Sequence, residues 1–191
     1  EDGQVQYTCL PNGKGGIVDD MLVYRVADDH YFMVPNAANI DKDWEWMSKI
    51  AEEMGMKLGE EFVNESEQWA QLAVQGPNAL KAMQKLTSAN VVDMKYYTFQ
   101  IITFAGIENI IFSTTGYTGA GGCEIYMPAK YAKNVWDAVF EAGKEYIEKG
   151  GVVKNPQTHK MVIDNVINCA QNLGYEIPCC VIGTSKLHNP Y

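Results

Sequence analysis

Two stretches of the chain place ionisable side chains in unusual surroundings. The first puts Asp19 and Asp20 in the middle of an apolar, β-branched run. The second, residues 115–124, packs four glycines around Tyr117 and ends at Glu124. Removing an ionised carboxylate from water is costly unless the carboxylate is paired, so unpaired aspartates and glutamates are not expected in an ordinary hydrophobic core. Both stretches are therefore candidates for contact with a ligand.

The first stretch belongs to residues 17–26, whose composition predicts a β-strand with alternate side chains on opposite faces. Arg25 indicates that the face carrying Asp19 meets solvent near the end of the strand, so we expect Asp20 on the more apolar face. A carboxylate there either finds hydrogen-bond donors or takes up a proton, which makes Asp20 a functional candidate. The alternative is that both aspartates are solvated at a hairpin end, an interpretation that fits Asp19 better than Asp20.

The second stretch has four glycines in seven positions, which permits positive φ angles and the close approach of a ligand to the backbone. Tyr117 offers a flat ring and a hydroxyl, and Glu124 offers an acceptor, so together they suit a planar heterocycle with ring NH groups. The alternative is a long hairpin loop, because the pattern is neither a phosphate loop nor a dinucleotide fingerprint. Asn36 is a candidate donor or a turn residue, and Tyr96-Tyr97 either stacks on a ring or packs on a half-buried strand.

Composition bounds the remaining possibilities. The chain has 191 residues, 47% hydrophobic and 20% charged, which is typical of a globular protein. A net charge of −9 argues against a nucleic-acid partner. No apolar run is long enough for a membrane span, and the acidic start is unlike a signal peptide. The five cysteines are odd in number and have no metal-ligand spacing, so we expect reduced thiols in a cytoplasmic protein and no metal.

Hydrophobic periodicity and turn residues predict an α+β fold, with antiparallel or mixed sheets and flanking helices. The apolar positions Ile40, Trp44, Met47, Ile50 and Met54 follow helical spacing. Strands are expected at 4–10, 17–26, 31–35, 70–75, 98–104, 109–113, 123–128 and 176–182, and helices at 41–54, after Pro77, at 131–147 and at 156–173.

Residues from about 4 to 145 resemble the glycine cleavage system T-protein, the aminomethyltransferase. The order and combination of several motifs carry the resemblance, although each alone would be weak. They are QYTCLPNGKGGIVDDMLVY at 6–24, NAANIDKDW at 36–44, LAVQGPNA at 72–79, YYTF at 96–99 and TGYTGAGGCE at 115–124.

The resemblance implies transfer of an aminomethyl carbon from the lipoylated H-protein to tetrahydrofolate, with release of ammonia. Asp20 matches the family's key aspartate, which contacts the folate ring nitrogens and assists attack by electrostatics and positioning as much as by proton transfer. Glu124 would bind the amino and ring NH groups of the same pterin. The positions that line the family's folate pocket match Tyr7, Val34, Asn36, Tyr96, Tyr117 and Glu124.

The resemblance also implies a partial T-protein folate-binding fold. We expect a β-hairpin-rich folate-pocket module at 1–66, an α+β module with the glycine-rich loop at 67–145, and a foreign-looking helix-strand tail at 146–191. The family has a further segment before this start and a further domain after it, so we expect a fragment that is weakly active or inactive.

The tail, about 140–191, resembles the C-terminal end of hemolysin A-type rRNA 2′-O-methyltransferases, and FEAGKE at 140–145 fits both families, which favours a chimera. The alternatives to an aminomethyltransferase are a non-catalytic folate-binding relative, a folate domain of a sarcosine- or dimethylglycine-type enzyme and, on the tail alone, an RNA methyltransferase fragment.

Overall fold

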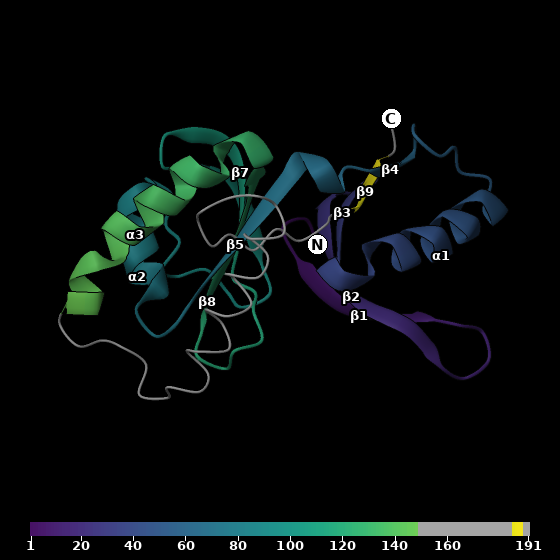
Figure 1. Ribbon diagram of the computed structural model, residues 1–191, viewed down its shortest axis with the longest axis horizontal. Coiled ribbons are helices and arrows are strands. Elements are labelled where there is room, and N and C mark those ends of the chain that lie inside the picture. The colour runs from purple at the N-terminus through teal and green to yellow at the C-terminus, as the bar shows by residue number, and fades with distance from the viewer. Residues whose placement is uncertain (149–184, 189–191) are drawn as a thin grey trace. The chain divides into compact units, whose positions relative to one another are not determined.

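The computed structural model of the protein describes residues 1–148 and 185–188. These residues form two compact units, one comprising 1–69 with 185–188 and the other comprising 70–148. Each unit is built on its own antiparallel sheet (Figure 1). The predicted helix 156–173 and strand 176–182 lie outside the described residues.

The first unit is a five-stranded sheet with a helix on one face. Its first strands form consecutive hairpins, and the tight turn of the first one needs Gly13 at a φ of +72°. The sheet order is β1-β2-β3-β9-β4. The elements are β1 (Val5–Pro11), β2 (Ile17–Ala27), β3 (His30–Pro35), the 3-10 turn η1 (Ala37–Asn39), α1 (Ile40–Glu53), β4 (Phe62–Asn64), the turn η2 (Ser66–Gln68) and β9 (Ser185–His188).

The face of β2 that carries Asp19 and Met21 packs against α1. Met21 is buried with Met47 of α1 and Phe62 of β4. Near the end of β2 this face meets solvent as predicted, because the long side chain of Arg25 is partly exposed and reaches out to pair with Asp2 at 3.0 Å.

The helical spacing predicted for α1 is correct, but the buried stripe is rotated from the expected one. Asp43, Met47 and Ala51 are buried at intervals of four residues. Ile50 and Met54 are exposed by 39% and 74%, although both fit the apolar pattern. An aspartate therefore occupies a position in the buried stripe of α1.

The second unit is a four-stranded sheet in the order β5-β8-β7-β6. Its helices lie against the sheet, as Figure 1 shows for α2 and α3. The elements are β5 (Trp69–Gln75), α2 (Ala79–Met83), the 3-10 turn η3 (Gln84–Leu86), β6 (Phe99–Phe104), β7 (Ile107–Ser113), β8 (Gly122–Pro128), the turn η4 (Ala129–Tyr131) and α3 (Ala132–Glu148).

The core of this unit forms where the helices meet one face of the sheet. Phe112 of β7 and Ile125 of β8 are fully buried against Met83 of α2 and Val135 of α3. Burial of such side chains supplies about 1.5–3 kcal/mol each relative to exposure. Phe140, which fits the predicted inner stripe of α3, is half-exposed and packs against a neighbouring tryptophan.

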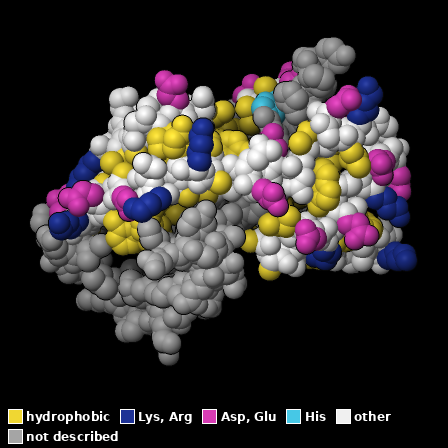
Figure 2. All heavy atoms as spheres, turned by 45° about the horizontal axis from the view of Figure 1, so that its top comes forward, with side chains coloured by type: hydrophobic (Ala, Val, Ile, Leu, Met, Phe, Trp, Pro, Cys, Tyr) yellow, Lys and Arg dark blue, Asp and Glu magenta, His cyan; other side chains and the backbone are white. Residues whose placement is uncertain are grey.

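The observed architecture confirms the predicted α+β class, with antiparallel sheets and flanking helices. Strand β4 was missed because it has only three residues in an acidic stretch without clear periodicity. Among the described residues, no helix has the length and apolar character needed to cross a membrane. On the face shown in Figure 2, the Lys and Arg side chains are scattered rather than gathered in one patch.

Candidate functional site

Strand register brings several of the predicted site residues to one face of the first sheet. Tyr7 of β1 and Val34 of β3 both pair with Leu22 of β2. Because side chains alternate along a strand, these three share a face with Asp20, two positions before Leu22. Asn36 follows the end of β3 by one residue. The hairpins thus gather Tyr7, Asp20 and Val34 on one surface, with Asn36 at its edge.

Hydrogen bonds hold both oxygens of the Asp20 carboxylate. The hydroxyl of Tyr7 donates to Oδ2 at 2.7 Å, and Nδ2 of Asn36 donates to Oδ1 at 2.9 Å. Tyr7 is 55% exposed and Asp20 is half-buried, so the carboxylate lies at the surface of this unit. The Asp20 carboxylate therefore has the hydrogen-bond donors that we expected from its position on the strand. Asn36 is a donor to this carboxylate and not simply a turn residue.

Asp19 lies on the opposite face of β2, beside the start of α1. Its side chain is only 10% exposed, and Lys42 pairs with Oδ2 at 2.7 Å. Asn39 donates to the same oxygen. The hydrogen bond from Lys42 lowers the pKa of Asp19 well below its usual range, against the opposing effect of burial. The interpretation of Asp19 as a solvated hairpin residue is wrong.

A further carboxylate, Asp43, is fully buried beside this pair. Lys42 lies 3.3 Å from its Oδ1, and neither carboxylate oxygen has a hydrogen-bond partner in the described part of the chain. Burial raises the pKa of Asp43 above its ordinary value, and Asp19 adds to that rise. Asp43 was not among the predicted site residues, because its place in the helix pattern gave no sign of burial.

In the second unit, Glu124 is buried on β8 with 6% exposure. It alternates with Cys123 and Ile125, which belong to the hydrophobic core, so its side chain is on the other face of the sheet. The hydroxyls of Thr115 and Tyr126 both donate to the same oxygen, Oε2, with a distance of 3.3 Å for Tyr126.

Because both hydroxyls use Oε2 of Glu124, neither of them occupies Oε1. Burial raises the pKa of Glu124, although its hydrogen bonds act in the opposite direction. Gln71 donates at 3.1 Å to the hydroxyl of Tyr126, which extends the chain of donors behind Glu124. The arrangement fixes one oxygen of the Glu124 carboxylate with two hydroxyls.

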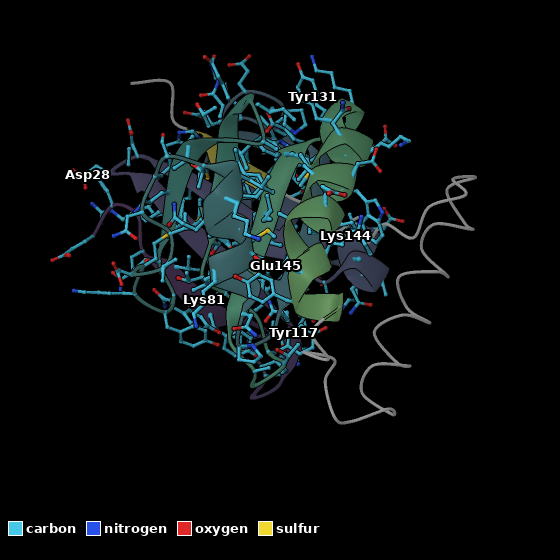
Figure 3. All side chains as sticks on the ribbon, turned by 90° about the vertical axis from the view of Figure 1, so that its left-hand side faces the viewer. Asp28, Lys81, Tyr117, Tyr131, Lys144 and Glu145 are labelled. Carbon is cyan, nitrogen blue, oxygen red and sulfur yellow. The ribbon has the colours of Figure 1, made fainter. Side chains whose placement is uncertain are left out.

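The two remaining predicted residues lie at the glycine-rich loop. Tyr96 is exposed, and its hydroxyl donates at 2.8 Å to the backbone carbonyl of Gly116. Tyr117 is 99% exposed and projects from one end of the second unit (Figure 3). Tyr96 therefore braces the loop, whereas the ring of Tyr117 does not pack against the body of its unit.

The structure thus presents two groups, one in each unit. The first contains Tyr7, Asp20, Asn36 and Val34, and the second contains Tyr96, Tyr117 and Glu124. Sequence reasoning missed the residues that support them: Asn39, Lys42, Asp43, Gln71, Thr115 and Tyr126. A signal for two of them was present, because Asn39 and Lys42 follow Asn36 at intervals of three across the predicted start of a helix.

Antiparallel sheets with helices on their faces, carrying clusters of hydrogen-bonded carboxylates, define an α+β protein with candidate sites for a polar small molecule. The family model described as the GCVT N-terminal domain matches residues 1–152. The chain belongs to this family, which confirms the resemblance for residues of about 4–145.

Similar proteins agree with the family. An aminomethyltransferase of Bacteroides fragilis is 54% identical over 144 residues, which are 75% of this chain and 38% of that protein. One of Flavobacterium psychrophilum is 50% identical over 145 residues, covering 76% and 39%. The chain therefore spans about two-fifths of the length of these curated relatives.

A solved structure supports the fold. The crystal structure of glycine cleavage system aminomethyltransferase T from Bartonella henselae matches with a TM-score of 0.58 and 25% sequence identity. The match covers 73% of this chain and 36% of that one. The architecture described here is thus shared with a member of the glycine cleavage T-protein family.

Proposed function

We propose that this chain carries the folate-contacting part of an aminomethyltransferase of the glycine cleavage system. The reaction would pass the aminomethyl carbon of the lipoylated H-protein to tetrahydrofolate and release ammonia. The relatives at about 50% identity support the reaction class. The observation that carries the proposal is the hydrogen bonding of Asp20 by Tyr7 and Asn36, since all three match the family's folate positions.

Asp20 would act by electrostatics and position. Its carboxylate is held from both sides, so it needs little reorganisation when a cationic or NH-bearing group approaches. Preorganised charge of this kind stabilises positive charge that develops during the transfer. Tetrahydrofolate, when bound, supplies the nitrogen nucleophiles that take up the one-carbon unit. Tyr7, which is 55% exposed, would provide apolar surface beside the carboxylate, whereas Val34 is buried with 6% exposure.

Glu124 would recognise the pterin. Its carboxylate is held in place by two hydroxyls on Oε2, so the group would act as a preorganised acceptor for a neighbouring pair of amino and ring NH donors. The exposed rings of Tyr96 and Tyr117 would pack beside the heterocycle. The acceptor and the flat rings of the second unit therefore suit the pterin of a folate.

Titration of the 191-residue chain with tetrahydrofolate by calorimetry tests the binding. Asp20→Asn and Glu124→Gln should each weaken binding at least tenfold, since hydrogen bonds to charged groups contribute about 1.5–3 kcal/mol. The matched controls are Asp41→Asn and Glu108→Gln, which remove one charge at exposed positions. Unchanged affinity in both site variants would contradict the assignment.

Ammonia release from aminomethyl-loaded H-protein then tests the transfer. Ammonia release that depends on tetrahydrofolate and is abolished by Asp20→Ala supports an aminomethyltransferase that acts with the H-protein. We propose that this enzyme is cytoplasmic. Folate binding without ammonia release would instead favour a non-catalytic folate-binding relative. Binding of a methyl donor would favour the RNA methyltransferase alternative suggested by the tail.

A further inference from the structure

Asp19 is the most heavily coordinated carboxylate of the first unit. Its Oδ1 accepts from the backbone N–H of Asp20 at 2.8 Å and from Nδ2 of Asn36 at 2.8 Å. Its Oδ2 accepts from Nζ of Lys42 at 2.7 Å and from Nδ2 of Asn39. Four donors from β2, the end of β3 and the start of α1 therefore converge on one side chain.

Asn36 connects Asp19 to Asp20. Its Nδ2 lies 2.8 Å from Oδ1 of Asp19, 2.9 Å from Oδ1 of Asp20 and 3.0 Å from the backbone carbonyl of Asp20. An amide nitrogen carries two protons, so these three acceptors share them. The orientation of Asn36 thus depends on both aspartates, and removal of the Asp19 acceptor leaves the amide held by Asp20 alone.

The geometry points to Asp19 as a positioning residue: anchored by Lys42 and Asn39, it fixes the amide of Asn36, which in turn fixes the carboxylate of Asp20. This inference rests on the proposed function, because it assigns the orientation of the carboxylate that would face the folate. Asp19 itself would touch neither substrate nor folate, since its side chain is on the α1 face of β2.

The anchoring of Asp19 is stronger than helix attachment alone requires. Lys42 also donates at 2.8 Å to the backbone carbonyl of Val18, so the start of α1 is already tied to β2 by a second bond. Lys42 additionally faces the buried Asp43 at 3.3 Å. The Lys42 ammonium group therefore lies beside two carboxylates, those of Asp19 and Asp43. Of these two, Asp19 has hydrogen bonds to both of its oxygens and also holds the Asn36 amide.

The test replaces Asp19 with an isosteric group that lacks the charge. Asp19→Asn replaces one of the two acceptor oxygens with an NH₂ group, so two of the four donors lose their acceptor and Asn36 should be held less firmly. The side-chain amide of Asn36 is observed by ¹⁵N nuclear magnetic resonance in the free 191-residue protein. In Asp19→Asn its hydrogen exchange should accelerate at least tenfold, whereas Asp41→Asn, an exposed change of the same type at the start of α1, should leave it unaltered.

A second variant covers the case in which Asp19→Asn does not fold. Lys42→Met removes the anchor itself, at a side chain that is 47% exposed. Asp19 should then be held less firmly, and exchange at Asn36 should accelerate in the same direction but by less. Unchanged exchange at Asn36 in either folded variant overturns the inference without reference to folate.

Tetrahydrofolate titration supplies the functional readout. In a folded Asp19→Asn protein, Kd should rise about tenfold, corresponding to one charge-assisted hydrogen bond. Faster exchange at Asn36 with an unchanged Kd overturns the positioning role. Failure of the unaltered protein to bind tetrahydrofolate contradicts the proposed function instead, and the exchange measurement still decides whether Asp19 positions Asn36.

Discussion

The side-chain Nε2 of Gln75, at the end of β5, donates a hydrogen bond of 2.9 Å to the backbone carbonyl of Cys123 on β8. The same nitrogen lies 3.2 Å from the carbonyl oxygen of Thr115, and the hydroxyl of Thr118 donates to Oε1 at 3.1 Å. One side chain therefore ties both ends of the glycine-rich loop, as well as its interior, to the neighbouring strand.

Gln75→Ala should destabilise the second unit by about 1–3 kcal/mol, because it leaves two partly buried carbonyl oxygens without their donor. Urea unfolding at pH 7 measures the change. Gln100→Ala, an exposed glutamine on β6, is the control and should fall within about 0.5 kcal/mol of the unaltered protein. Equal stability of the two variants would show that the loop is held by other contacts.

Glu124 should make folding stability depend on pH in an unusual direction. Burial raises the pKa of Glu124 in the folded protein above its ordinary value of 4.5. At a pH between 4.5 and the folded-state pKa, the folded protein therefore binds more protons than the unfolded chain. Stability contributed by this group is then lost as the pH rises above 4.5.

The comparison of Glu124→Gln with the unaltered protein isolates this effect. Stability is measured by urea unfolding at intervals from about pH 4 to about pH 8. The difference between the two proteins should shift in favour of Glu124→Gln as the pH increases, because the glutamine has no charge to bury. Parallel pH curves would mean that Glu124 ionises in the folded state as freely as in the unfolded state.

Much of the first group of site residues could be predicted from local patterns. Asn12-Gly13 marks a tight hairpin, and the alternation along 17–26 puts Asp20 two residues from Leu22. Because hairpin register follows from turn geometry, the sequence is sufficient to predict that Tyr7 and Asp20 share a face of the sheet. The resemblance then added the role of Asp20, which spacing alone left open.

The pairing of the supporting residues could not be predicted, because it depends on tertiary packing, although the spacing of Asn39 and Lys42 from Asn36 gave a signal for those two residues. Helical periodicity located α1, but it selected Ile50 and Met54 for the core, whereas the sheet covers the stripe containing Asp43 and Ala51. A rotation of the helix by one residue changes which polar side chain is buried. The pairing of Asp19 with Lys42 follows from that rotation, and nothing in the sequence fixes it.

Lys42→Met should destabilise the first unit at neutral pH, and the loss should diminish on acidification. The hydrogen bond from Lys42 lowers the pKa of Asp19 below its ordinary value of 3.8. A carboxylate of this kind contributes stability above pH 3.8 that is lost as the pH falls toward its folded-state pKa. Unfolding at about pH 7 and about pH 3 measures the change. Lys49→Met, at an exposed position of α1, is the control, and an equal effect of both substitutions would show that the Asp19 pair is unimportant.

Gly119, in the loop before β8, and Gly122, the first residue of β8, should respond very differently to substitution by alanine. Gly119 has a φ of +70° and open space where an added Cβ would lie, so Gly119→Ala should cost only the backbone penalty of about 1–2 kcal/mol. At Gly122 an added Cβ would lie 2.4 Å from the backbone carbonyl oxygen of Val74, at a φ of +138°. Backbone cannot yield as a flexible side chain does, so Gly122→Ala should cost about 3 kcal/mol or more. Urea unfolding measures both costs, and equal midpoints for the two variants would show that the strands separate at this point without cost.

The close approach at Gly122 couples β5 to β8 directly beside Gln75, so the damage in Gly122→Ala should also be visible locally. The backbone N–H of Gly76 donates to the carbonyl of Gly121 at 2.7 Å, and this bond must lengthen if the added Cβ pushes the two strands apart. Hydrogen exchange at Gly76 should therefore accelerate in Gly122→Ala and remain unchanged in Gly119→Ala. Faster hydrogen exchange at Gly76 in both variants would contradict this expectation. It would mean that either substitution loosens the whole loop, rather than that Gly122→Ala alone separates the two strands.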